Sequence, residues 1–191
     1  MVSLIHLIIT LFKITILAII YATLTLLIFK LIAKFQPNSW FDRITRKKFK
    51  FWFISGFIIS GGLFWFMFSH FGKHGFGDSA RIPIGHFRSI QEIDGIQAYI
   101  QDVENGVYAL DINKFYITDD FVYGITGSHY ENYNGGYFLY DLDKNKVRTF
   151  ELIDDYKNEL IKIGLEPNVE YKEFNYYYKQ YWNGWRFWLL P

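Results

Sequence analysis

The sequence predicts a membrane-anchored α+β protein, in which a two-helix transmembrane hairpin precedes a small soluble domain with an antiparallel β-meander and one or two helices. Three observations support this fold class. Two long apolar stretches, residues 4–35 and 51–71, flank a short basic segment. From residue 96 onward, short runs rich in aromatic and β-branched residues are separated by Gly, Asn and Asp. The formal charge also changes sign between the two parts of the chain.

The two apolar stretches have the length of membrane spans. Residues 51–71 contain no Asp, Glu, Lys or Arg, and at a rise of about 1.5 Å per residue they extend over about 30 Å, the thickness of the hydrocarbon core. Lys13 interrupts the first stretch, but a lysine near the bilayer boundary can place its ammonium among the headgroups. We therefore set the spans at about residues 9–34 and 51–71. A cleaved signal peptide is the alternative, but its apolar core would be too long and no A-x-A cleavage site follows.

Charge asymmetry predicts the orientation. Short loops rich in Lys and Arg stay in the cytoplasm, so the loop over residues 36–50 is expected there, against anionic lipid. Both termini and the C-terminal domain are then extracytoplasmic. The strong use of Lys, Asn, Ile, Phe and Tyr is typical of AT-rich bacterial genomes and favours a bacterial inner membrane. Against the single acid Asp42, the loop carries Arg43, Arg46, Lys47, Lys48 and Lys50.

The charge of the outer part limits its partners. Residues 1–71 carry eight Lys or Arg and one Asp, a formal charge of +7. Residues 72–191 carry twelve Lys or Arg and eighteen Asp or Glu, a formal charge of −6. Phosphate binding needs clustered cations, so nucleic acid is not an expected partner. The chain contains no cysteine, which excludes disulfides and thiolate metal sites.

The two spans are expected to pack on each other. Ala18 and Ala22 in the first span, and Gly56 and Ser60 in the second, each place small residues one helical turn apart. Small residues at this spacing let helix backbones approach closely in lipid.

The outer part is predicted to begin with an irregular neck over residues 72–95, because Gly72, Gly75, Gly77 and Pro83 break the second helix. Residues 96–191 form the predicted β-rich domain. A helix is expected over residues 154–163. The strands are expected over residues 96–103, 107–112, 114–118, 121–126, 136–142 and 146–152.

The last segment, residues 171–191, is very rich in Tyr, Phe and Trp and has two interpretations. One is a final strand or two that complete the sheet and fill the core. The other places these rings at the bilayer interface, where Trp and Tyr are favoured.

Three weak patterns of metal or haem ligands occur. His70 and His74, followed by Asp78, would share a helix face only if the helix continued through the glycines. His6 could lie at the depth of His70, where two imidazoles could hold a haem. The turn with Asp141, Asp143 and Asn145 opens like a calcium loop but lacks its later Gly and Glu. Turn formation explains those side chains, and we predict neither a metal nor a cofactor.

Two functions from different classes remain. The first is a non-enzymatic module whose acidic, aromatic domain binds a protein, either as an accessory subunit of an envelope complex, as an immunity-type protein, or as a homo-oligomer. The second is a membrane-bound enzyme or a sensor of a small ligand or lipid headgroup, with its site in the neck. The candidate binding residues are Asp78, Arg81, His86, Arg88, Trp182 and Trp185.

Overall fold

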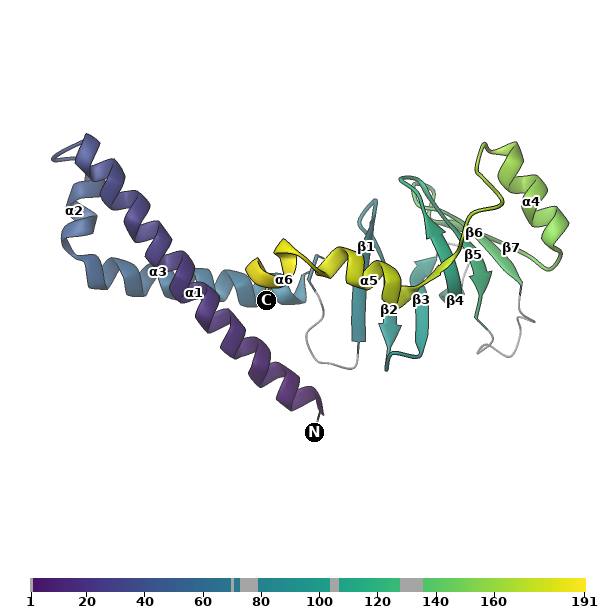
Figure 1. Ribbon diagram of the computed structural model, residues 1–191, viewed down its shortest axis with the longest axis horizontal. Helices are drawn as coiled ribbons and strands as arrows, with labels where there is room; N and C mark the ends of the chain where they lie inside the picture. Colours follow the sequence, from purple (N-terminus) through teal and green to yellow (C-terminus); the bar gives the residue numbers. More distant parts are fainter. Residues whose placement is uncertain (1, 70, 73–78, 104–106, 128–135) are drawn as a thin grey trace. The chain divides into compact units, whose positions relative to one another are not determined.

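The computed structural model describes residues 2–69, 71–72, 79–103, 107–127 and 136–191 and divides the chain into two compact units (Figure 1). The first unit joins residues 1–76 to residues 184–191, and the second is residues 77–183. The first unit contains the helices α1 (Val2–Phe35), α2 (Trp40–Arg46), α3 (Lys48–Phe68) and α6 (Trp185–Leu189).

The second unit contains strands and two helices. Its strands are β1 (Ser79–Gly85), β2 (Arg88–Ile93), β3 (Gln97–Val103), β4 (Val107–Ile117), β5 (Phe121–Thr126), β6 (Tyr137–Asp141), β7 (Lys146–Phe150) and β8 (Lys172–Glu173). Its helices are α4 (Ile153–Lys162) and α5 (Phe174–Trp182).

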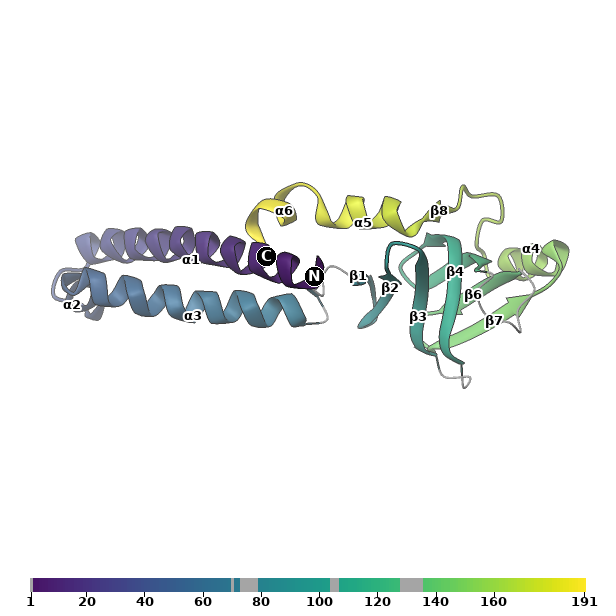
Figure 2. The same cartoon turned by 90° about the horizontal axis from the view of Figure 1, so that it is seen from below.

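Helices α1 and α3 pack side by side and are connected through α2 (Figure 2). By length and composition, both are apolar enough to cross a bilayer. The turn into α2 is capped by Ser39, whose hydroxyl accepts a hydrogen bond from the backbone N–H of Asp42. Asp42 also pairs with Arg46 one turn later at 2.8 Å.

Small residues lie where α1 meets α3. Ala18 and Ala22 are buried, and a Cβ added at Gly56 would lie 3.6 Å from the Cβ of Ala22. Gly56 and Ser60 also line a hollow of about 180 Å³ beside α1. One turn away, the indole N–H of Trp52 in α3 donates to the hydroxyl of Thr23 in α1 at 3.0 Å. The absence of bulky side chains at these positions brings the two backbones close.

The C-terminal helix α6 packs on α1, although the two helices lie at opposite ends of the sequence. The hydroxyl of Tyr21 donates to the backbone carbonyl of Leu189 at 2.6 Å. The ammonium of Lys13 lies 4.9 Å from the ring centre of Phe187, a cation–π distance. Trp188, also in α6, keeps 72% of its surface exposed.

The predicted antiparallel meander is confirmed. Among the described residues, strands β1 to β7 pair in chain order, each antiparallel to the next. The expected strands 107–112 and 114–118 are one continuous strand, β4, because Asn113 forms an irregularity in the ladder between Ile112 and Lys114 instead of ending the strand.

The predicted neck over residues 72–95 differs from the structure, in which residues 79–93 form the hairpin of β1 and β2. Two features that suggested an irregular chain fit this hairpin. Pro83 is tolerated because β1 is an edge strand and needs no amide donor on its outer side. Gly85, with φ of +95°, begins a tight turn in which His86 and Phe87 also adopt positive φ.

Two helices cover opposite faces of the sheet, and each buries its own core. On one face, Phe174 of α5 packs with inward residues of the strands, including Ile82, Ile90 and Ile112. On the other face, Tyr156 and Leu160 of α4 pack on the outward side chains of β5 and β6. The helix predicted over residues 154–163 is thus confirmed as α4, and Gly164 follows it with φ of +79°.

The aromatic C-terminal segment divides after Asn183 between the two structural units. Instead of a final strand, residues 174–182 form helix α5, which packs on the sheet core after the two-residue strand β8. Beyond Gly184 the chain belongs to the helical unit.

Candidate functional site

The described residues that were predicted to form a site in the neck lie at two places on the β1–β2 hairpin, Arg81 within β1 and His86 and Arg88 at its turn. Asp78, His70 and His74 lie outside the described residues. Arg81 lies in the middle of β1, four positions before Gly85, or about 13 Å along the strand. Its side chain lies on the face opposite the core residue Ile82, and burial lowers the pKa of its guanidinium.

His86 and Arg88 lie at the turn between β1 and β2, close to two other hairpin turns. The imidazole of His86 is 3.5 Å from a carboxylate oxygen of Asp120 and 3.9 Å from one of Asp143. These side chains are well exposed, so screening by water leaves little energy in the pairs. The arrangement brings three turns together at one end of the sheet.

The two tryptophan candidates have different environments. The indole N–H of Trp182 donates to the backbone carbonyl of Arg81 at 2.9 Å, and the ring is buried. Trp182 therefore occupies the open edge of β1 and shields it from pairing with another strand. Trp185 belongs to α6 and is exposed.

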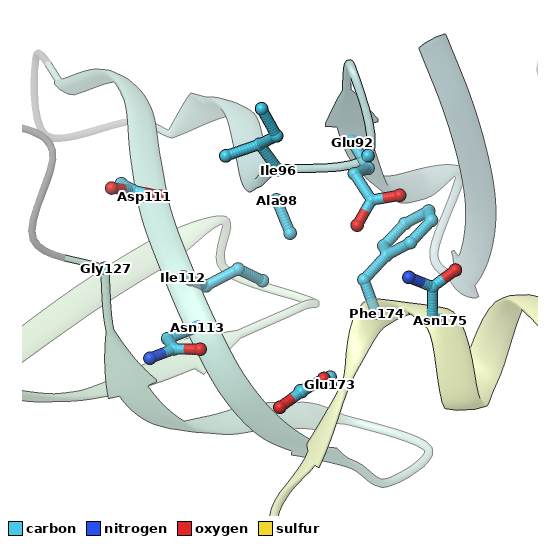
Figure 3. Close-up of a pocket in the computed structure, with 11 residues that line it drawn as sticks. Glu92, Ile96, Ala98, Asp111, Ile112, Asn113, Gly127, Glu173, Phe174 and Asn175 are labelled. Atoms are coloured by element: carbon cyan, nitrogen blue, oxygen red, sulfur yellow. The ribbon is translucent and has the colours of Figure 1, made fainter. Parts of the chain in front are cut away.

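A cavity of about 220 Å³ opens in the sheet unit where β4 changes its partner strand. The first half of β4 pairs with β3, which starts at Gln97. Beyond Asn113, β5 takes one edge of β4, and β8 takes the edge that β3 has left free, with Lys114 opposite Glu173. The cavity lies between the turn from β2 to β3 and the start of α5 (Figure 3).

The walls of this cavity, which we call the Glu92 cavity, combine acidic, amide and apolar groups. Three carboxylates and two asparagines line it, and no Lys, Arg or His does so among the described residues. Its complete lining is Glu92, Gly95, Ile96, Ala98, Asp111, Ile112, Asn113, Gly127, Glu173, Phe174 and Asn175.

Glu92 is a buried acidic residue whose carboxylate faces the cavity. Its side chain shares the inward face of β2 with Ile90, and only 9% of its surface is exposed. Figure 3 shows the carboxylate directed into the space between Ala98, Ile112 and Phe174. Within the described part of the chain, it has neither a hydrogen bond nor an ion pair.

Burial raises the pKa of Glu92, because the charged form loses water without gaining a partner. Its charge is felt by the nearby phenol of Tyr178 on α5, whose pKa is raised by burial first and by Glu92 second. A carboxylate without a partner in such a place is suited to binding a cation.

The other two acidic residues of the lining, Asp111 and Glu173, have contacts with neighbouring residues. The backbone N–H of Gly127 donates to the carbonyl of Asp111 at 3.0 Å. A Cβ at Gly127 would lie 2.3 Å from the Asp111 carboxylate, so a larger residue there would require this carboxylate to move. Glu173 lies at the rim, where its carboxylate is 3.6 Å from the ammonium of Lys114.

The described residues hold no group of three or more His, Cys, Asp or Glu side chains suited to a metal ion. The Glu92 cavity was not predicted from the sequence. The sequence feature that could have revealed it is the spacing of Ile90 and Glu92. Two residues apart in a strand, they share a face, so Glu92 lies on the inward face with Ile90. That signal has meaning only when residues 88–93 are recognised as a strand.

No family model matches this sequence, and no curated protein or solved structure is significantly similar to it.

Proposed function

We propose that this protein is a binding module anchored in the bacterial inner membrane, with α1 and α3 as its transmembrane hairpin. The observation that carries the proposal is the outward position of large apolar side chains around these helices. On α3, Phe57 is 78% exposed and Trp65 is 74% exposed, whereas the small residue Ala22 of α1 is buried where the two helices meet. Apolar surface of this extent is stable only in contact with lipid or protein.

The basic residues between the helices support the orientation. Arg43, Arg46, Lys47 and Lys48 lie in or beside α2, at the loop end of the hairpin. With this end in the cytoplasm, the sheet unit is extracytoplasmic. Helix α6 then adds a short contact with lipid through its exposed Trp188.

The charge of the sheet unit supports a protein partner with a basic surface. Residues 77–183 carry eighteen Asp or Glu and ten Lys or Arg, a formal charge of −8. Complementary charge accelerates association and selects among partners. The three neighbouring turns add exposed acids at one end of the sheet, including Asp120 and Asp143.

The topology is tested by labelling single cysteines, which is straightforward because the chain has none of its own. Lys47→Cys and Glu151→Cys are both at exposed positions, one beside α2 and one after β7. A membrane-impermeant maleimide applied to spheroplasts should label Glu151→Cys at once and Lys47→Cys only after lysis. The reverse pattern would overturn the orientation, and labelling of both before lysis would overturn the hairpin.

The partner is tested by purifying the tagged full chain in mild detergent at low and at high salt. A stoichiometric protein that is retained at low salt and lost at high salt is expected. A chain that elutes alone under both conditions would contradict the proposal.

The Glu92 cavity favours a second candidate function, sensing of a small ligand. This candidate belongs to the second class considered from the sequence, but it moves the site from the neck to the inward face of β2.

A further inference from the structure

The Glu92 side chain is buried beside a cavity, and the described part of the chain provides no counter-ion for its carboxylate. Moving a carboxylate out of water is costly unless a cation or hydrogen-bond donors replace the water. The described part of the chain supplies neither to Glu92. A purely structural residue at this inward position would be apolar, like its neighbour Ile90.

The shape and lining of the cavity indicate the kind of cation. On one side of the carboxylate lie the buried side chains of Ala98, Ile112 and Phe174, and the exposed Ile96 completes a small apolar wall. An inorganic ion would leave that wall without a contact, and no cluster of metal-ligating side chains occurs in the described residues. An organic cation uses both parts, with its charged head at the carboxylate and its body on the wall.

The volume limits the size of the ligand. About 220 Å³ is roughly seven times the ~30 Å³ that a water molecule occupies in the liquid. A molecule of about five to eight non-hydrogen atoms therefore fits, well below the usual size of a drug-like ligand.

We propose that the Glu92 cavity binds a small organic ammonium ion, with the ammonium at the Glu92 carboxylate and the hydrocarbon part against Ile96, the most exposed apolar residue of the lining. The side-chain oxygens of Asn113 and Asn175, which also line the cavity, are available to accept the remaining N–H groups. This assignment deepens the second candidate function, ligand sensing, and is independent of the proposed protein partner.

Isothermal titration of the full chain in nanodiscs tests the assignment, with empty nanodiscs to subtract partition into lipid. The probes are pentylamine and 1-pentanol, which have the same size and differ in charge. We expect saturable binding of pentylamine at one site and at least tenfold weaker binding of pentanol. Binding of both with similar affinity, or of neither, would overturn the proposal.

The Glu92→Gln variant locates the site, because it removes the charge and keeps the shape. The matched control is Glu151→Gln, which removes one charge at an exposed position outside the cavity lining. Pentylamine affinity should fall at least tenfold in Glu92→Gln and stay within twofold in Glu151→Gln. Unchanged affinity in Glu92→Gln would refute the site. If this variant does not fold, the comparison of pentylamine with pentanol on the unmodified chain still decides the question.

Discussion

Replacement of Gly124 by alanine tests the geometry that positions the Glu92 cavity. Gly124 lies in β5 opposite Phe115 of β4, beside the irregularity at Asn113. A Cβ at this position would lie 2.1 Å from the backbone oxygen of Lys114 and 2.6 Å from the Cα of Phe115. Both atoms belong to the backbone, so no side-chain rotation can relieve the overlap.

The expected cost follows from the displacement that the methyl group requires. An ordinary contact of 3.4 Å would need β4 and β5 to separate by more than 1 Å. This lengthens adjacent N–H···O bonds of the ladder beyond ~3.2 Å, the normal limit. Loss of two such bonds costs about 2 kcal/mol and overpacking another 1–3 kcal/mol. The total of about 3–5 kcal/mol is a large fraction of the ~5–15 kcal/mol that stabilises a typical domain.

Thermal unfolding of the full chain in detergent, followed by near-ultraviolet circular dichroism, measures this effect. At about 4–8 °C per kcal/mol, Tm should fall by about 12 °C or more. Gly164→Ala is the control: it has no atom within 4 Å of the added Cβ, and its positive φ alone costs about 1–2 kcal/mol. A Gly124→Ala variant as stable as Gly164→Ala would refute the close approach of the strands.

Two further predictions concern Glu92 and Trp182. Because burial raises the pKa of Glu92, the folded chain binds more protons than the unfolded chain between the ordinary and the raised pKa, and stability falls as pH rises through that interval. The free energy of unfolding of Glu92→Gln minus that of the natural chain, measured by urea titration, should therefore increase from pH 4 to pH 8, by about 1.4 kcal/mol for each unit by which the pKa is raised; a difference that does not change with pH would contradict it. Trp182→Phe removes the hydrogen bond to the Arg81 carbonyl and should lower the free energy of unfolding by about 1–3 kcal/mol, measured by urea titration; a change below about 0.5 kcal/mol would show that the edge of β1 does not depend on the indole.

The meander was predictable because its strands alternate in sequence with Asp- and Asn-rich turns that the structure retains. The β1–β2 hairpin was not predictable in the same way. Pro83 and Gly85 have the same local signature in a loop and at a sheet edge, and only the pairing of β1 with β2 distinguishes the two cases. Glu92 could not be identified for the same reason, because its inward position exists only within that pairing.

Helix α5 was predictable from the spacing of its aromatic residues, although its composition suggested a strand. Its aromatic residues have high strand propensity, yet those that pack on the sheet core recur at the spacing of a helix face. Periodicity was therefore more informative than propensity for this segment. The residues concerned are Phe174, Tyr177, Tyr178, Tyr181 and Trp182.

Two chain segments connect the sheet unit to the helical unit. This double connection determines how the sheet unit would respond to mechanical load or to a protease. A pull transmitted through a bound partner is shared by two connections, near residues 76–77 and 183–184. A single cut at the first connection would not release the sheet unit, because α6 would still hold it through Leu189 on Tyr21 and Phe187 on Lys13. That remaining attachment is non-covalent, so detergent or force would detach it, whereas the intact first connection would resist both.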